Sequence, residues 1–438
     1  MGTTDSRLTT ETKLKRIAWL SAKDHRKEFS NLMHLNSVEA LAGCFNELDG
    51  RKAVGADGIT KEAYREKLGP NLLDLIARMK RMAYTPGPVR QVMIPKEGKP
   101  GAKRPLGIGN LEDKIVQKMT QKILESIFEP VFLKCSYGFR PELGCHDAIR
   151  ALRDYLYRNE VRTVIDVDLA NFFGTIDHKQ LENILRKRIK DETFIRYLIR
   201  MFKAGVLADG ELIISDEGVP QGSPCSPVLA NIFAHYVIDD WFENIVKARC
   251  RGQVEMFRYC DDFVICCQYD DDTKRIKQVL GKRLSKYGLR LNEEKTKLVP
   301  FSSREASNGS KQGAFDFLGF TLYLGCSKAG QIIPKVKTIG KRYRSKLKKV
   351  NDWCRVMRSQ YRLKEIWKRF CIKLAGHIQY YGVSFNTKRV CTFCSHSIRI
   401  FFKWINRRSQ RQSFSCDKFN MFMKKYPPPK ARICHSLF

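Results

Sequence analysis

The chain has 438 residues, 43% of them hydrophobic and 11% aromatic, which excludes a disordered chain. With 80 Lys and Arg against 46 Asp and Glu, its formal net charge is +34, so a polyanionic partner is expected. The 15 cysteines are odd in number and scattered, which argues against a disulfide framework and favours reduced thiols. No run approaches the roughly 18 apolar residues of a membrane span, so no membrane partner is expected.

The basic charge is concentrated towards the C-terminus. Residues 321–438 hold 28 Lys and Arg against 3 Asp and Glu, a net charge of +25, which leaves +9 for residues 1–320. We therefore expect the C-terminal part to form the basic surface that binds a nucleic acid.

The first 132 residues read as helices interrupted by one segment of short strands. Residues 1–35 are highly charged and predicted to be partly helical, and a Gly-rich turn at 54–58 interrupts the helical periodicity of residues 38–73. Prolines then punctuate short strands, including one over 89–95. A helix is predicted over 111–132, since its apolar residues fall on one face: Ile115, Met119, Ile123 and Ile127.

The middle of the chain mixes strands with helices. A strand is predicted over 163–169, a buried helix over 229–242, a strand-turn-strand over 257–267 and an apolar hairpin over 315–324. Beyond about Lys335 the chain is predicted to form basic helices. This order favours an α+β domain followed by a helical one.

Two adjacent carboxylates, Asp261 and Asp262, stand at the predicted turn between apolar strands. Like charges this close raise each other's pKa unless something neutralises them. Mg²⁺ does so, and it favours one or two carboxylates together with substrate phosphates. Taken alone, such a pair is more often an ordinary exposed turn.

A second acidic site changes that interpretation. Asp166 and Asp168 lie on one face of an apolar strand, and Asp168 falls near its end, where it can meet the Asp261 turn across a sheet. Carboxylates so placed can hold two metals about 3.5–4 Å apart, which activate an attacking oxygen and stabilise a leaving one. For Asp166, a solvent-facing position is an equally open interpretation.

The segment Tyr-Cys-Asp-Asp at 259–262 resembles the Tyr-x-Asp-Asp signature of reverse transcriptases. Further blocks resemble those of group II intron reverse transcriptases, in the family's order. They are residues 94–96 with 103–108, Ser-Tyr-Gly-Phe-Arg-Pro at 136–141, the Pro-Gln-Gly block at 218–227, residues 291–297, Phe-Leu-Gly-Phe at 317–320, and the maturase-like segment 375–383.

This resemblance implies a right-hand polymerase of α+β class. It implies an N-terminal extension over residues 1–37 and a fingers and palm domain over 38–324 with a carboxylate-bearing antiparallel sheet. A basic α-helical thumb of maturase type, with a short basic tail, would occupy residues 325–438.

The resemblance also assigns roles to individual residues. It implies that Asp168, Asp261 and Asp262 are catalytic and bind two Mg²⁺ per active site, with Mn²⁺ as a substitute. Phe173 would be the aromatic gate beneath the incoming sugar, where it would collide with a 2′-OH. Lys295 would protonate pyrophosphate or neutralise phosphate, although a surface role is equally open. The other implied nucleotide-binding residues are Lys96 and Arg104 at the triphosphate, and Gln221 and Gly222 through their backbone.

Two positions depart from the family's pattern, and one motif invites a different interpretation. Cys260 stands where intron enzymes commonly have Ala, beside the expected primer end, and Gly174 stands where Asp is frequent. Cys391, Cys394 and His396 suggest zinc, but a structural site needs four ligands. We interpret that segment as a thumb helix.

The expected function is an RNA-directed DNA polymerase that adds deoxynucleotides to primer DNA and binds a structured intron RNA as a maturase in splicing and mobility. It would act in a bacterial cytoplasm on nucleoid-associated nucleic acid. One alternative is a related enzyme that serves phage defence, CRISPR spacer acquisition or DNA repair. A non-catalytic RNA-binding maturase is disfavoured because all three aspartates are present. The template RNA, the priming mechanism and the oligomeric state stay open.

The charge distribution yields a first prediction. The logarithm of RNA affinity falls linearly with the logarithm of salt concentration, and each neutralised phosphate contributes about −0.7 to −0.9 to the slope. Neutral replacement of six basic residues should therefore make this slope shallower by several units. The six are Lys341, Arg342, Arg344, Lys346, Lys348 and Lys349. Binding to structured RNA should weaken more than nucleotide addition on a pre-annealed primer. An unchanged slope would mean that the cluster does not touch the RNA backbone.

Overall fold

The computed structural model describes residues 9–95, 101, 103–208, 211–219, 222–408 and 414–437; the expected nucleotide contacts Lys96 and Gln221 lie outside them. The chain forms two compact units. Unit 1 holds the described residues up to Gly144 together with 167–263 and 271–296. Unit 2 holds residues 145–166 and 264–270 and the described residues from Lys297 onwards.

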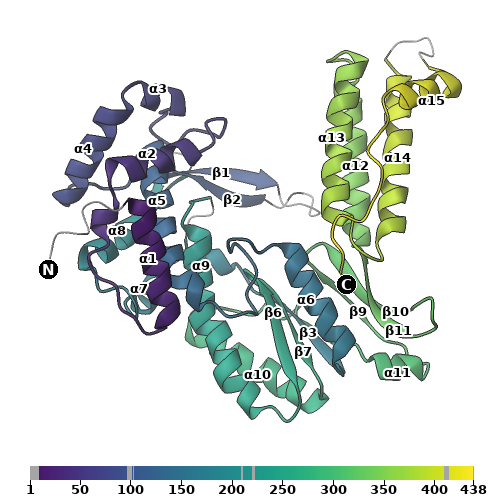
Figure 1. Cartoon of the computed structure of the whole chain (residues 1–438), viewed down its shortest axis with the longest axis horizontal. Coiled ribbons are helices and arrows are strands. Elements are labelled where there is room, and N and C mark those ends of the chain that lie inside the picture. Colours follow the sequence, from purple (N-terminus) through teal and green to yellow (C-terminus); the bar gives the residue numbers. More distant parts are fainter. Residues whose placement is uncertain are drawn as a thin grey trace. The chain divides into compact units, whose positions relative to one another are not determined.

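Unit 1 is built around the predicted long helix, α5 (Leu111–Phe128). Its expected apolar face is confirmed, since Ile115, Met119, Ile123 and Ile127 are all buried. Three helices pack against it (Figure 1): α1 (Thr10–Lys23), α2 (Val38–Glu47) and α9 (Ser226–Ala234). Further helices in this part of the chain are α3 (Lys61–Glu66), α4 (Leu68–Lys80), α7 (His178–Leu185), α8 (Glu192–Phe202) and α10 (Asp270–Lys286).

A buried arginine fastens the N-terminal helix to this unit. Arg188 donates hydrogen bonds to the Ser21 hydroxyl at 2.9 Å, the Ile127 carbonyl at 2.8 Å and the Asp24 carbonyl at 3.2 Å. Because a buried guanidinium without acceptors would be costly, these contacts tie α1 to α5.

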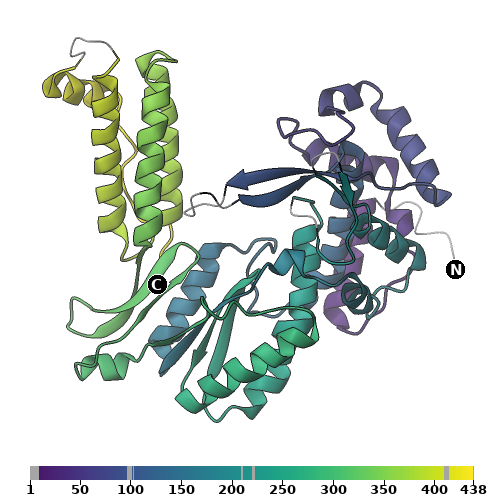
Figure 2. The same cartoon turned by 180° about the vertical axis from the view of Figure 1, so that it is seen from behind.

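A four-stranded sheet carries the predicted strand over 89–95. Its order is β2-β1-β4-β5, with β1 antiparallel to β2 and parallel to β4. The strands are β1 (Val89–Pro95), β2 (Lys103–Ile108), β4 (Val206–Ala208) and β5 (Glu211–Ile213). Register places Arg104 opposite Ile94 in the β1–β2 hairpin, which both views show as a long ribbon (Figures 1 and 2).

A second four-stranded sheet carries the acidic residues at the ends of its strands. Its order is β6-β7-β3-β8, with β6 (Val254–Tyr259), β7 (Asp262–Cys267), β3 (Thr163–Asp168) and β8 (Lys297–Pro300). The strands predicted over 163–169 and over 257–267 are confirmed. Their runs of buried apolar side chains are typical of strands inside a sheet. Asp168 is the last residue of β3, Asp261 lies in the turn, and Asp262 is the first residue of β7.

The predicted helix over 229–242 is helical, but only part of it is an α-helix. Regular α geometry ends with α9 at Ala234, and π-helical turns follow over His235–Asp239 and Phe242–Val246. A π turn inserts an extra residue and so rotates the side chains that follow it. Asp239 lies in the first of these turns and is fully buried.

Unit 2 contains a three-stranded antiparallel sheet and the C-terminal helices. The sheet order is β11-β10-β9, with β9 (Ala314–Phe317), β10 (Phe320–Cys326) and β11 (Ile332–Thr338). The predicted hairpin is confirmed by β9 and β10. The expectation of helices beyond about Lys335 is wrong for 335–338, which continue β11 with Val336 and Thr338 buried.

The basic helices begin at Gly340 and run side by side in both views (Figures 1 and 2). Cys391, Cys394 and His396 lie within α14, which confirms the helical interpretation of that segment. Among the described residues, no helix is long and apolar enough to cross a membrane. The helices of unit 2 are α6 (Cys145–Arg158), α11 (Ser303–Ser307), α12 (Gly340–Met357), α13 (Leu363–Tyr381), α14 (Thr387–Ile405) and α15 (Cys416–Lys425).

Candidate active site

Asp168 is held at the end of β3 by the segment that follows α10. Its backbone carbonyl accepts a hydrogen bond from Asn292 N–H at 2.8 Å, and its N–H donates to the Thr296 hydroxyl at 3.4 Å. Its carboxylate Oδ2 lies 2.6 Å from Lys295 Nζ. The 291–297 block therefore fixes the backbone of Asp168 and supplies a counter-charge to its side chain.

Asp261 comes to the same site from the turn between β6 and β7. Burial raises the pKa of the Asp261 carboxyl above its ordinary value, and the negative charge of Asp168 acts in the same direction. The structure thus brings together two of the predicted catalytic carboxylates, which are far apart in the sequence. Asp262 begins β7 and is half-buried.

Cys260 gives the turn its unusual backbone. Its φ is +62°, a left-handed conformation that non-glycine residues rarely adopt. Its side chain is only 3% exposed, and burial raises the pKa of the thiol to about 12, so it is a neutral thiol near pH 7. The thiol therefore lies inside the protein rather than on its surface.

The Ser-Tyr-Gly-Phe-Arg-Pro block packs directly against this turn. Tyr137 N–H donates to the Arg258 carbonyl at 2.9 Å, and Arg258 N–H donates to the Cys135 carbonyl at 2.7 Å. A Cβ at Gly138 would lie 2.6 Å from the Cys260 nitrogen, so only glycine permits this approach. The block thus supports the backbone that carries Asp261.

Phe173 lies in a short 3₁₀ turn five residues after Asp168. The Phe173 carbonyl accepts a hydrogen bond from Val219 N–H at 2.8 Å, and its half-buried ring meets Phe172 edge-on. A cavity of about 210 Å³ lies against this turn, and its lining includes Asn171 and Gly174. A Cβ at Gly174 would lie 2.4 Å from the Asn171 side-chain nitrogen, so a larger residue there would displace that side chain.

The other described nucleotide-binding candidates are Gly222 and Arg104. Gly222 has φ +114°, and a Cβ there would lie 2.4 Å from the Gly107 carbonyl, so its close neighbour is strand β2. Arg104 is exposed on β2 and forms no ion pair with the part of the chain that the structure describes. Their proposed contacts with nucleotide stay predictions.

The chemistry of the site suits a divalent cation. The negative charges of Asp168 and Asp261 repel each other, and Asp168 already attracts one cation, the ammonium of Lys295. Hard carboxylate oxygens of this kind are the ligands that Mg²⁺ prefers. Within the described ranges, however, no group of three or more His, Cys, Asp or Glu side chains is arranged to hold a metal ion. The three-aspartate ligand set therefore stays a prediction.

Sequence reasoning missed the polar groups beneath the turn. Arg258 and Asp239 are both fully buried and form an ion pair. Neither charge stands out in the sequence, because Arg258 shares its strand with Glu255 and Asp239 is followed directly by Asp240. Such charges are buried only when paired.

Comparisons with known proteins identify the family of this chain. The family described as "Reverse transcriptase (RNA-dependent DNA polymerase)" matches residues 94–322, more than half of the chain. Protein YkfC of Escherichia coli (strain K12) is 33% identical over 316 residues, which cover 65% of this chain and 79% of YkfC.

Two further relatives are encoded in introns. The group II intron-encoded protein LtrA of Lactococcus lactis subsp. cremoris is 35% identical over 226 residues, which cover 51% of this chain and 37% of LtrA. An uncharacterized 91 kDa protein in the cob intron of Schizosaccharomyces pombe is 36% identical over 162 residues, which cover 37% of this chain and 19% of that protein. The chain therefore spans well under two thirds of these two relatives.

The raised pKa of Asp261 predicts how this site affects stability. The charged carboxylate is disfavoured in the folded protein, so Asp261→Asn should raise the melting temperature in EDTA at neutral pH by a few degrees. The folded pKa lies above the unfolded one. The gain should therefore disappear as pH falls through the folded pKa towards the ordinary aspartate range.

Thermal melting across a pH series measures this effect, with Asp316→Asn, an exposed aspartate on β9, as the matched control. A variant that melts below the wild type at neutral pH would contradict the electrostatic account of the site.

Proposed function

The chain belongs to the reverse transcriptase family of RNA-dependent DNA polymerases, and from that premise we propose that it is an enzyme of the group II intron type. It would extend a DNA primer with deoxynucleotides on a structured RNA template and bind its intron RNA as a maturase. The observation that supports this best is the meeting of Asp168, Asp261 and Lys295 in one site.

Asp168 and Asp261 are the residues proposed to hold two Mg²⁺ ions, with Asp262 as the third carboxylate. When bound, the ions would supply the charge stabilisation that phosphoryl transfer requires. The protein's own contribution is to position the carboxylates through their backbone. Lys295 Nζ lies 2.6 Å from Asp168 Oδ2, and its proposed roles are to neutralise the triphosphate and to give a proton to the leaving pyrophosphate.

The cavity beside Phe173 supports a site for the incoming nucleotide. Gly107, Gly174 and Gly218 line it, and small residues leave room for a ligand close to the backbone. The ring of Phe173 would exclude a 2′-OH from this position. Arg104 and Gly222, together with Lys96 and Gln221, are proposed to contact the nucleotide.

The maturase part of the proposal rests on the basic helices and on the relatives. Helix α12 carries six Lys and Arg within residues 341–349, and its surface charge suits phosphate neutralisation. LtrA is named as a group II intron-encoded protein, and the match to it covers half of this chain. An intron RNA is therefore the proposed structured partner.

Removal of either central carboxylate tests the catalytic proposal. Asp168→Ala and Asp261→Ala should each slow metal-dependent primer extension on an RNA template by more than about 100-fold. RNA affinity should change little, because the main basic charge lies in unit 2. Asp316→Ala, which removes an exposed aspartate, is the control and should extend normally. Extension at the wild-type rate by either site variant would refute the two-metal assignment.

The second test concerns choice of sugar. Phe173→Ala should raise the efficiency of ribonucleotide incorporation relative to deoxynucleotide by about tenfold or more, because it removes the ring that would collide with a 2′-OH. Single-nucleotide incorporation kinetics with both substrates measure the ratio. Phe172→Leu alters the fully buried neighbour and should leave the ratio unchanged. If the Phe173→Ala ratio equals that of the wild type, Phe173 is a core residue and not a gate.

A further inference from the structure

A fully buried ion pair lies directly beneath the turn that carries Asp261. Arg258 and Asp239 are both 0% exposed. The guanidinium binds the carboxylate with two parallel hydrogen bonds, from Nε to Oδ1 at 2.6 Å and from Nη2 to Oδ2 at 2.5 Å. Burial of two charges costs several kcal/mol for each ion unless their geometry and remaining hydrogen bonds compensate. Because this ion pair is isolated from water, the other hydrogen bonds of its side chains must help to offset that cost.

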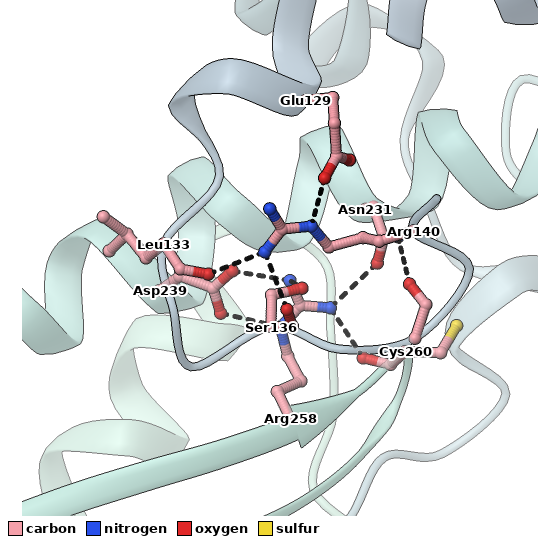
Figure 3. Close-up of polar contacts among 9 residues, drawn as sticks. Glu129, Leu133, Ser136, Arg140, Asn231, Asp239, Arg258 and Cys260 are labelled. Atoms are coloured by element: carbon pink, nitrogen blue, oxygen red, sulfur yellow. Dashed lines mark hydrogen bonds and ion pairs between the residues drawn. The ribbon is translucent and has the colours of Figure 1, made fainter. Parts of the chain in front are cut away.

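The remaining donors of Arg258 all have acceptors. Nη1 donates to the Asn231 side-chain oxygen at 3.1 Å and to the Cys260 carbonyl at 3.0 Å, and Nη2 donates to the Ser136 hydroxyl at 2.7 Å (Figure 3). With the two bonds to Asp239, all five N–H groups of the guanidinium are satisfied. The orientation of the planar group is thus fixed from several sides at once.

The contact with Cys260 links this network to catalysis. The Cys260 carbonyl belongs to the peptide that leads into Asp261, and Cys260 has the left-handed φ of +62°. A non-glycine residue in that region is strained and persists only where its surroundings enforce it. The bond from Arg258 orients this peptide and therefore the start of Asp261.

The same network holds the opposite side of the turn. Asn231 Nδ2 donates to the Gly138 carbonyl at 2.6 Å, and Gly138 packs against the Cys260 nitrogen. Arg140 in turn fixes the loop, because it donates to Glu129 and to the carbonyls of Leu133 and Ser136 (Figure 3). The turn is therefore clamped between Arg258 beneath it and the loop that Asn231 holds against it.

We propose that Arg258 is a positioning residue, which through the Cys260 carbonyl holds Asp261 in the place where a divalent cation is bound, with Asp239 and Asn231 fixing Arg258 itself. This inference rests on the proposed function. A purely structural ion pair would contribute to stability alone, and its loss would leave the cation affinity of the folded protein unchanged. Residues that orient metal ligands usually change metal affinity about 10–100-fold when they are replaced.

The experiment compares three variants of the full chain. Arg258→Lys keeps a charge for Asp239 but cannot supply all five donors. Asn231→Ala keeps the ion pair and removes the tie to Gly138. Arg188→Lys is the control, because Arg188 is also a buried arginine, with hydrogen bonds to uncharged oxygens only, and it holds α1 instead of the turn. Melting curves in EDTA establish that each protein is folded.

Mn²⁺ binding is then measured by electron paramagnetic resonance in a complex with an RNA template, a chain-terminated primer and the next deoxynucleotide. Arg258→Lys should weaken Mn²⁺ binding about tenfold and Asn231→Ala about threefold, while Arg188→Lys should match the wild type. Wild-type Mn²⁺ affinity in folded Arg258→Lys would overturn the inference. If that variant does not fold, Asn231→Ala decides in the same way.

The two possible failures are distinguishable. A wild-type protein that neither binds Mn²⁺ in this complex nor extends an unblocked primer would sink the proposed function. Wild-type activity together with unaltered Mn²⁺ binding in the variants would sink only the role of Arg258.

Discussion

The structure depends on bringing two negative charges together and neutralising them. Asp168 ends strand β3 and Asp261 lies in the turn between β6 and β7, where burial and the charge of Asp168 both disfavour the ionised form of Asp261. In the protein alone, Lys295 balances one of them at 2.6 Å from Oδ2. That ion pair is half exposed and therefore contributes little to stability. A site that is only weakly neutralised by the protein remains ready for a stronger cation, which is what the proposed two-metal chemistry requires.

A carboxylate serves this purpose only if its backbone does not move, and both aspartates are held in that way. Residues Asn292 and Thr296 hold the main chain of Asp168. The guanidinium of Arg258 holds the peptide before Asp261. Two of the family's sequence blocks thus hold the backbone around these aspartates. The block at 291–297 surrounds one aspartate, and the block at 136–141 supports the turn that bears the other.

Much of this arrangement could be predicted from local sequence, because β-branched and apolar runs identify central strands. The strands that bear Asp168 and Asp262, and the buried face of α5, follow from such patterns. The burial of Asp239 could not be predicted, because a π turn shifts the helical phase that periodicity assumes. The end of β11 was missed because Lys335 and Lys337 suggested a basic helix, although they alternate with buried Val336 and Thr338.

Contacts between residues far apart in the sequence were the other feature that could not be predicted. The close approach of Gly222 to Gly107 joins segments more than 100 residues apart, and no local pattern reveals it. The resemblance of motifs supplied the order of the blocks, but the structure alone shows how a buried arginine connects two of them. Arg258 lies within the predicted strand-turn-strand over 257–267, yet its role depends on Asp239 and Asn231, which lie outside that segment.

The central claim is that Asp168 and Asp261 share bound cations in place of the Lys295 contact. The most direct measurement is an experimental structure of the chain with an RNA template, a chain-terminated primer, the next deoxynucleotide and Mn²⁺, with anomalous scattering to locate the metal. The account predicts two anomalous peaks about 3.5–4 Å apart, in contact with the carboxylates of Asp168 and Asp261, with Lys295 Nζ displaced from Asp168 Oδ2 towards phosphate. Metal peaks away from both carboxylates, with Lys295 still bound to Asp168, would contradict it.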